Sequence, residues 1–304
     1  MKKLSLILLL LAPFAMYAQD LLDMLDEMEE EKREFTIATF KTTRVVNAQS
    51  IEMPAPGVMQ LNISHRFGKL NGGFYDLFGL DQANMRFDFE YGLTPWLALG
   101  VGRSNINKTY DGSLKLKLLR QSSGKFVMPI SLAYAGGIAV NTLRWADPDR
   151  ENFFSSRLTY YHQLLIARKF GDRLSLQLTP TVIHRNLVAT TQDENDVYAV
   201  GIGGRFKVSG GVTVNAEYFY LLPGWPGTGY TAGINENSLS IGVDIETGGH
   251  VFQLIFSNSL GMTPNYFVTE TFDTWQSGGV RFGFNLSRVF TVSKKANLWD
   301  GRDL

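Results

Sequence analysis

The chain of 304 residues contains no cysteine and only four histidines. The absence of cysteine excludes disulfides, thiolate metal sites, a cysteine nucleophile and an acylated N-terminal cysteine. The histidines are His65, His162, His184 and His250, and no two of them have the spacing of metal ligands. The sequence therefore predicts no metal site and no cofactor.

The chain also lacks a long apolar run and an excess of either charge. No segment offers the about 20 consecutive apolar residues that a spanning helix needs. Lysine and arginine together number 29, as do aspartate and glutamate. Without Lys2 and Lys3 the balance is 27 against 29, a net charge of −2. Nucleic-acid binders carry a basic excess or stripe, so no nucleic-acid partner is predicted.

Residues 1–18 have the pattern of a secretory signal peptide. Lys2 and Lys3 form a basic start, residues 6–11 are apolar, and Ala18 precedes a plausible cleavage point at Gln19. The apolar run is too short to span a membrane as a helix. The pattern predicts export, and together with the features below it predicts the outer membrane of a Gram-negative bacterium.

What the sequence does contain is a regular alternation of tight turns and long connections after Pro56. The long connections have roughly five to fifteen residues, and such asymmetry is typical of outer-membrane barrels, which have short turns at the periplasmic end. The tight turns are expected at residues 92–95, 122–124, 171–172, 209–210 and 248–249.

Between the turns, apolar and polar residues alternate with a period of two, the pattern of a strand with one apolar and one polar face. Most of these runs have nine or more residues, enough to cross a bilayer at a tilt. The predicted fold class is all-β: a single antiparallel transmembrane β-barrel of about twelve strands, with a short N-terminal helical arm. The expected strands are 58–68, 83–91, 96–104, 110–121, 125–138, 154–170, 173–186, 196–208, 211–222, 237–247, 250–261 and 277–290.

An antiparallel sheet with one face in water gives the same alternation. Aromatic residues at one level of the apolar face favour the membrane instead, because they gather at bilayer interfaces. The predicted girdle at the tight-turn end is Phe126, Phe170, Phe206, Phe252 and Phe290.

The barrel is expected over residues 58–290, followed by a C-terminal periplasmic tail at 291–304. Residues 19–34 read as an acidic arm with apolar residues at helical spacing. Residues 35–57 end in a Pro-Ala-Pro-Gly break and are interpreted as a periplasmic plug or a lead-in segment.

Function is expected in the lumen, where charged residues of the polar faces point. Two interpretations stay open: a polar interior in which these charges pair, and a weakly anion-preferring channel, since Arg and Lys rings favour anions. Candidate plug residues are Lys41, Arg44, Asn47 and Glu52. Candidate lumen-lining residues are Arg66, Arg86, Asp88, Glu90, Lys115, Lys117, Arg157, Arg185, Arg205, Glu217, Asp244, Glu246 and Arg281.

An enzyme is the third hypothesis, because some barrels of similar size are phospholipases with a serine and a histidine on the outer wall. His162 lies on an apolar strand face and Ser156 is six residues earlier, about 20 Å away along a strand. No residue nearby orients the histidine, so no catalytic residue is predicted and the chain is not expected to be an enzyme.

Residues 40–52 (FKTTRVVNAQSIE) and 90–104 (EYGLTPWLALGVGRS) resemble an uncharacterised β-barrel family of the Bacteroidetes type, a domain of unknown function. The resemblance covers nearly all of the mature chain. It implies an outer-membrane barrel to which residues 40–52 belong, and it implies no cargo.

The favoured function is a porin-like channel or transporter for small polar solutes. The alternative is a structural or scaffold barrel that docks envelope partner proteins. Outer-membrane lipid is the expected surroundings in both cases.

Overall fold

The computed structural model describes residues 33–191, 193–222 and 235–293. The predicted signal peptide, most of the acidic arm and most of the C-terminal tail lie outside the described residues. Of the arm, Arg33 and Glu34 are described, and Glu34 belongs to a short strand rather than to a helix.

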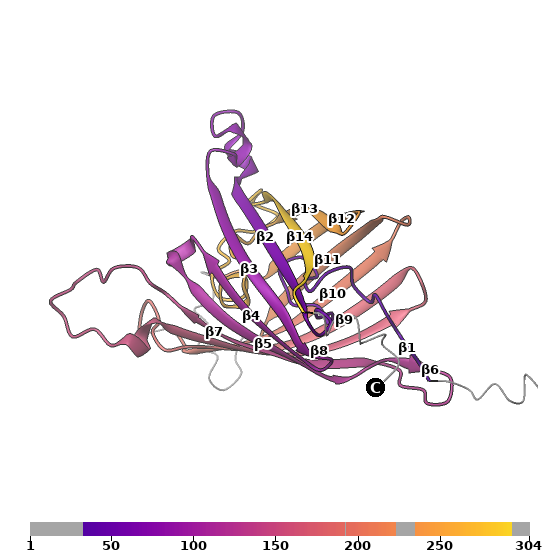
Figure 1. The fold of residues 1–304 in the computed structure, drawn as a ribbon. Helices are drawn as coiled ribbons and strands as arrows, with labels where there is room; N and C mark the ends of the chain where they lie inside the picture. The colour runs from indigo at the N-terminus through magenta and orange to yellow at the C-terminus, as the bar shows by residue number, and fades with distance from the viewer. Residues whose placement is uncertain (1–32, 192, 223–234, 294–304) are drawn as a thin grey trace, which may run out of the picture.

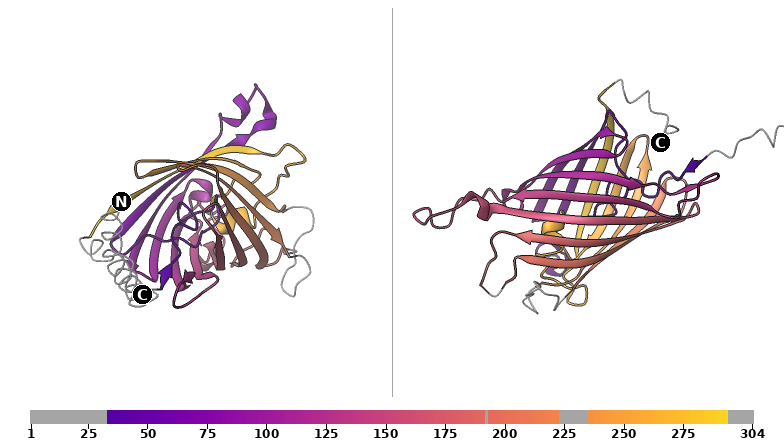
Figure 2. Two further views of the ribbon diagram at one scale, coloured as in Figure 1. Left: turned by 90° about the vertical axis from the view of Figure 1, so that its right-hand side faces the viewer. Right: turned by 90° about the horizontal axis from the view of Figure 1, so that it is seen from below.

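Twelve antiparallel strands form a closed barrel in which each strand pairs with its neighbours along the chain, and β14 pairs with β2 to close the ring (Figures 1 and 2). This confirms the predicted fold class. The barrel strands are β2 (Val58–Lys69), β3 (Ala83–Thr94), β4 (Leu97–Ser104), β5 (Tyr110–Leu119), β7 (Ser131–Val140), β8 (Leu158–Phe170), β9 (Leu174–Arg185), β10 (Asp196–Lys207), β11 (Val212–Leu221), β12 (Ser238–Thr247), β13 (His250–Ser257) and β14 (Arg281–Thr291).

Polar and apolar residues alternate along most strands, and in the structure the polar ones are buried in the lumen whereas the apolar ones are exposed on the outer wall. Along β11, Thr213, Asn215 and Glu217 are buried inside the barrel, whereas Val214 and Tyr218 are exposed on its outer wall. Since successive side chains point to opposite faces of a strand, one strand supplies both the apolar outer surface and the lumen wall.

The expected strand at 125–138 starts later, at Ser131, and the expected tight turn at 122–124 is part of a longer connection. Pro129 has no N–H to donate to a ladder, so β7 begins beyond it. Ser122–Ser123 form β6, which pairs with β1 (Glu34–Phe35) in a separate two-stranded sheet.

Pro180 stays within β9, although the ladder to β8 is interrupted there. Paired residues are Gln163 with Thr181 and then Ile166 with Leu178, with no pairs between them. The missing N–H of Pro180 accounts for this interruption on one side of β9, while β10 pairs with Pro180 through Val200 on the other.

Short helical turns lie only in connections. They are η1 (Leu70–Gly72), η2 (Leu77–Gly79), η3 (Ile106–Lys108), η4 (Phe154–Arg157) and α2 (Pro264–Phe267). Among the described residues, no helix has the length and apolar character to cross a membrane.

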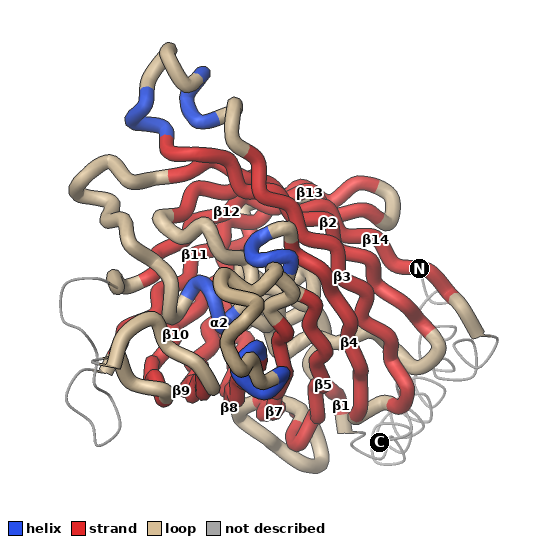
Figure 3. Tube along the Cα trace, turned by 90° about the vertical axis from the view of Figure 1, so that its left-hand side faces the viewer, coloured by secondary structure: helices blue, strands red, loops and turns tan. Residues whose placement is uncertain are grey.

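Two segments enter the ring of strands from opposite ends. The lumen segment, residues 36–57, enters from the tight-turn end and lies inside the ring in Figure 2. The mouth loop, residues 258–280, carries α2 and enters from the long-loop end, where Figure 3 shows α2 within the strand ring. These two segments determine what fills the barrel.

Candidate functional site

The lumen segment makes a hairpin-like reversal inside the barrel. The Val45 N–H donates to the Ala48 carbonyl at 2.9 Å, and the Ser50 N–H donates to the Thr43 carbonyl at 2.9 Å. Residues 43 to 50 therefore form two short arms with a tip at Val46–Asn47, and the whole reversal is buried apart from half-buried Arg44.

The tip is held by one carboxylate of the wall. Glu217 of β11, 2% exposed, accepts hydrogen bonds from the backbone N–H groups of Val46, Asn47 and Ala48 at 3.0, 2.8 and 3.0 Å. Three successive N–H groups that converge on one anion form the kind of concavity that binds phosphate in other proteins. Here the wall supplies the anion and the lumen segment supplies the concavity.

Arg44 connects the lumen segment to the acidic cluster on β3. Its guanidinium lies 3.1 Å from a carboxylate oxygen of Asp88 and 2.9 Å from one of Glu90. Arg86 completes the cluster, because it pairs with Asp88 at 3.3 Å and binds Asp111 of β5 in a bidentate manner. Buried charges need such partners, since an unpaired one is costly.

Several cations of the wall bind backbone oxygens of the lumen segment instead of carboxylates. Lys115 donates to the Glu52 carbonyl at 2.7 Å, and Arg205 donates to the Ala38 carbonyl at 2.8 Å. Amides of three further strands do the same: Gln253 Nε2 to Val45, Asn285 Nδ2 to Val46 and Gln177 Nε2 to Gln49, at 2.8, 2.9 and 2.8 Å.

Of the other predicted plug residues, two bind the wall through their side chains and one does not. Lys41 forms an ion pair with Glu246, and the Asn47 side chain accepts from Arg66 at 2.6 Å. Glu52 turns back on its own segment, where its carboxylate accepts from the Thr39 N–H at 2.7 Å.

An apolar part of this interface was missed by the sequence interpretation, which treated the lumen as polar. Phe40, Val45, Val46 and Ile51 pack in one cluster with inward residues of β7, β8 and β13, which are Ala133, Ala135, Leu165, Ala167 and Ile255. The signal was present in β7, whose sequence SLAYAGGIAV has no charged residue on either face. A strand that is apolar on both faces indicates that something other than water covers its inner side.

The mouth loop fills the other half of the lumen. Phe267 of α2 packs edge-on against Phe219 of β11, with ring centroids 4.9 Å apart, and the Tyr266 hydroxyl bonds to that of Thr109. Ala48 of the lumen segment belongs to the same buried cluster as Phe219 and Phe267. Residues of both inserted segments therefore share one buried apolar cluster inside the barrel.

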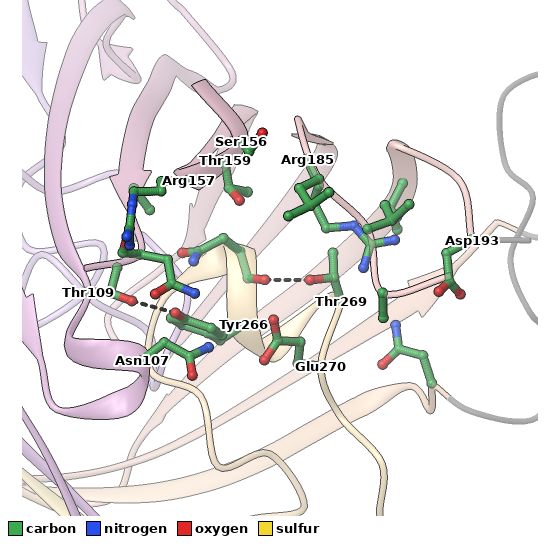
Figure 4. A pocket seen from close by; sticks show the side chains of 18 of the residues that line it. Asn107, Thr109, Ser156, Arg157, Thr159, Arg185, Asp193, Tyr266, Thr269 and Glu270 are labelled. Carbon is green, nitrogen blue, oxygen red and sulfur yellow. Dashed lines mark hydrogen bonds between the residues drawn. The ribbon is translucent and has the colours of Figure 1, made fainter. Parts of the chain in front are cut away.

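At the long-loop end of the barrel, a cavity of about 360 Å³ lies beside the mouth loop (Figure 4). We call it the mouth cavity. Two predicted lumen residues line this cavity: Arg185 is the last residue of wall strand β9, and Arg157 lies outside the wall in η4. Arg157 is part of η4, where its guanidinium stacks 3.8 Å from the ring centre of Trp145 and donates to the Asn141 and Leu143 carbonyls.

The remaining predicted residues have roles in the wall and at its rims. Asp244 accepts from Gln253 at 2.6 Å, and half-buried Lys117 shares a face of β5 with Lys115. Arg281 forms an ion pair with Asp273 of the mouth loop at 2.5 Å. Glu246 is exposed at the tight-turn end, beside the turn at 248–249.

The serine and histidine considered for an enzyme are not brought together. His162 is exposed on the outer wall, where its Nδ1 lies 2.5 Å from the Tyr134 hydroxyl of the adjacent strand. Ser156 lies in η4 at the long-loop end and lines the mouth cavity. Within the described part of the chain, no group of three or more His, Asp or Glu residues is arranged to hold a metal ion.

The fold and the filled lumen define a class: a twelve-stranded membrane-type β-barrel with inserted segments at both ends. The sequence matches the family described as "Membrane bound beta barrel domain (DUF5777)" over residues 40–290. The chain belongs to this family, a domain of unknown function. The match includes most of the lumen segment.

Solved structures with a similar fold are outer-membrane barrels of low sequence identity. An outer membrane channel from Pseudomonas putida F1 is 14% identical over 79% of this chain and 97% of its own, with a TM-score of 0.47. The KdgM porin is 11% identical over 76% and 99%, with a TM-score of 0.47. Outer membrane phospholipase A from Escherichia coli is 11% identical over 78% and 91%, with a TM-score of 0.43. A comparison with curated proteins found no match.

Proposed function

We propose that this chain is an outer-membrane channel for small polar solutes that is closed by its own lumen segment. The observation that carries the proposal is that residues 36–57 fill the tight-turn half of the barrel without being part of its wall. The twelve-stranded ladder closes through β14 and β2, so the barrel does not need the lumen segment for its own hydrogen bonding.

The contacts of the lumen segment suit a reversible closure. Glu217, Arg44 and Lys115 hold it through hydrogen bonds and ion pairs, and water can take over these bonds when the segment leaves the lumen. Both ends of the segment are fixed at the tight-turn end. There Phe35 pairs with β6, and the Gly57 N–H donates to the Gly92 carbonyl at 2.8 Å. The reversal between these two anchors can leave the lumen while its ends stay attached.

A weak preference for anions is a narrower part of the same proposal. Lys115, Arg66 and Arg205 bind neutral oxygens of the lumen segment rather than carboxylates. When the segment leaves, these cations face the passage, and rings of such groups favour anions. Replacing Lys115 and Lys117 by Glu should shift the ion preference of the open state toward cations. An unchanged reversal potential in a salt gradient would remove both lysines from the selectivity of the passage.

The absence of cysteine allows a direct test by disulfide locking. A Cβ built on Gly203 of β10 lies 3.8 Å from the Cβ of Val45, which is the usual Cβ separation across a disulfide. The double variant V45C/G203C should give no conductance steps in planar bilayers when oxidised and should recover them on reduction. The single variants V45C and G203C are the matched controls and should not respond to the reductant.

Two outcomes would contradict the proposal in different ways. Equal step frequency in the oxidised and reduced double variant would show that the lumen segment is not the closure. Silence of a folded variant that lacks residues 38–52 would show that the barrel is not a channel, and would favour the scaffold alternative.

The scaffold alternative has one supporting observation of its own. The guanidinium groups of Arg33 and Arg120 lie 4.5 and 4.0 Å from the ring centre of Phe35. These contacts hold residues 33–35, which follow most of the predicted acidic arm, against the connection that carries Arg120. If the arm docks an envelope protein, deleting residues 20–32 should abolish a co-purifying partner while the barrel remains folded.

A further inference from the structure

The mouth cavity is a built pocket rather than a gap between loops. It is lined by the barrel wall at β9, by η4 and by the mouth loop, and its volume of about 360 Å³ is within the range of small-molecule sites. Apolar side chains such as Leu187 and Phe272 line part of it, and polar groups converge on the rest (Figure 4). This mixture is typical of pockets that orient a polar ligand.

Two buried polar atoms and one carboxylate around the cavity have no hydrogen-bond partner among the described residues. The Asn265 side chain is only 5% exposed, and its Oδ1 accepts no hydrogen bond. The Nε of Arg185 is buried without an acceptor, although the same guanidinium donates to the Glu194 carbonyl, and the half-buried Glu270 carboxylate forms no hydrogen bond or ion pair with a described residue. Buried polar groups are nearly always paired, so several unpaired ones around one cavity indicate a missing ligand.

Two basic and two acidic side chains line the cavity. Arg157 and Arg185 are the bases, Asp193 and Glu270 are the acids, and Arg185 lies within electrostatic range of both acids. Glu270 and Arg185 are close enough to influence each other, yet they form no ion pair. A ligand that carries one charge would leave part of this field unmatched, whereas a ligand with two opposite charges would satisfy both sides.

We propose that the mouth cavity binds a small zwitterion of the amino-acid or dipeptide class. The ligand carboxylate is bound by Arg185, and its ammonium group is bound by Glu270 and by the Asn265 Oδ1. An ammonium group offers three donors, which suits a carboxylate and an amide oxygen, while a guanidinium suits a carboxylate. This proposal is independent of the proposed channel function, because ligand binding is measured on protein in detergent, where no current flows.

The protonation of Glu270 offers an independent readout. Burial raises the pKa of Glu270 to about 7, and Arg185 partly opposes this shift. The other charged or titratable groups that line the cavity are Arg157 of η4, Asp193 of the β9–β10 connection and Tyr266 of α2. An ammonium group placed beside Glu270 favours its ionised form, so binding at pH 7 should release a fraction of a proton.

The test is isothermal titration calorimetry of the full chain in detergent with alanyl-alanine as the probe. N-acetyl-alanyl-alanine retains only the negative charge, and alanyl-alanine amide retains only the positive one. The zwitterion should bind at least tenfold more tightly than either analogue. Its apparent enthalpy at pH 7 should depend on the ionisation enthalpy of the buffer, because protons are released.

Variants assign the two ends of the ligand. E270Q should weaken alanyl-alanine at least tenfold, abolish proton release and leave the N-acetyl analogue unchanged, whereas R185Q should weaken both. The matched control is E151Q, since Glu151 is an exposed acid of a neighbouring loop that does not line the cavity.

Three results would overturn the proposal. They are equal affinity for the zwitterion and its singly charged analogues, unchanged binding in E270Q, and no binding of the zwitterion to folded wild-type protein. If the protein bound glucose and not alanyl-alanine, the zwitterion proposal would be wrong and the cavity would be a carbohydrate site. Failure of the disulfide-lock experiment would leave the result of this test unaffected.

Discussion

At the scale of single residues, Glu217 is the group on which the seating of the lumen segment depends most. It is buried in the wall and accepts three backbone N–H groups from the tip of the segment. A hydrogen bond to a charged group contributes about 1.5–3 kcal/mol, more than a bond between neutral groups. No other side chain of the wall binds three successive residues of the segment among those described.

We therefore expect E217Q to release the lumen segment. The amide is neutral, and its NH₂ group cannot accept from the backbone N–H groups that face it. Loss of even one charge-assisted bond should raise the displaced population by about tenfold or more. Hydrogen exchange of residues 43–50 and the frequency of conductance steps should both increase. D111N is the matched control, because Asp111 is an acid of β5 that bonds to Arg86 of β3 and not to the lumen segment or to a residue that binds it. Equal effects of both variants would contradict the special role of Glu217.

A second residue-scale prediction concerns the pH dependence of the mouth loop. The pKa of Glu270 is raised by burial from 4.5 to about 7. Between these two values the opened loop has lost a proton that the folded loop keeps, so the stability of the folded loop falls as the pH rises through this window. Above pH 7 both states are ionised and the decline levels off.

The variant E270Q stays neutral at every pH, so its mouth loop should not show this decline. Hydrogen exchange of residues 258–280 at pH 5 and pH 8, corrected for the intrinsic exchange rate, measures the effect. Parallel pH slopes in wild type and E270Q would assign the pH dependence to another group.

At the scale of elements, the last residues of β3 do more than form part of the barrel wall. Gly92 carries the second anchor of the lumen segment: its carbonyl accepts from Gly57, and the Ala55 carbonyl oxygen would lie 2.2 Å from an added Cβ. No side chain fits in this space, so the close approach of the two backbones requires glycine.

We expect G92A to push residues 54–55 away and to loosen the lumen segment at this anchor. Conductance steps should become several-fold more frequent, and protection of residues 54–57 from hydrogen exchange should fall. G210A is the matched control, because Gly210 lies in the β10–β11 turn with open space around the position of its Cβ. If G210A raised the frequency of conductance steps as much as G92A does, the effect would be a general one of replacing glycine at the tight-turn end.

The elements also differ in how far the sequence predicted them. The twelve strands follow from the period-two alternation, which each strand carries within itself. The pairing of Ser122–Ser123 with β1 could not be predicted in the same way, because it joins two segments that are about 90 residues apart and have no shared pattern. The interior position of the mouth loop was not predicted, because Phe267 and Val268 are apolar residues in a connection without periodicity.

At the scale of the whole molecule, the outer wall carries the signature of a bilayer. Exposed apolar side chains cover the strands, and arginines near the tight-turn end lie over girdle rings. The guanidinium groups of Arg168 and Arg288 are 4.9 and 4.8 Å from the ring centres of Phe170 and Phe290. Such side chains reach the interface at little cost.

The depth of an outward-facing residue in the bilayer determines how much a charge at that position destabilises the barrel. Leu254 lies in the middle of β13 and is 44% exposed on the outer wall, and Leu174 begins β9 just after a tight turn. L254K should destabilise the folded barrel by about 2–4 kcal/mol and L174K by at most about 1 kcal/mol. Urea unfolding in lipid vesicles measures both values. Equal losses would contradict a membrane midplane at Leu254.

By itself the sequence determined the wall of this protein: the strand period, the number of strands and the sorting of apolar and polar faces. These features repeat every two residues, so each segment carries its own signal. Only the tertiary structure decided what the wall encloses. Glu217, Lys115 and Arg66 were recognised as inward groups, but their partners come from a segment far away in sequence and without a periodic pattern. Pairing inside a closed barrel depends on which backbone groups reach a given depth, and no local pattern of residues encodes that depth.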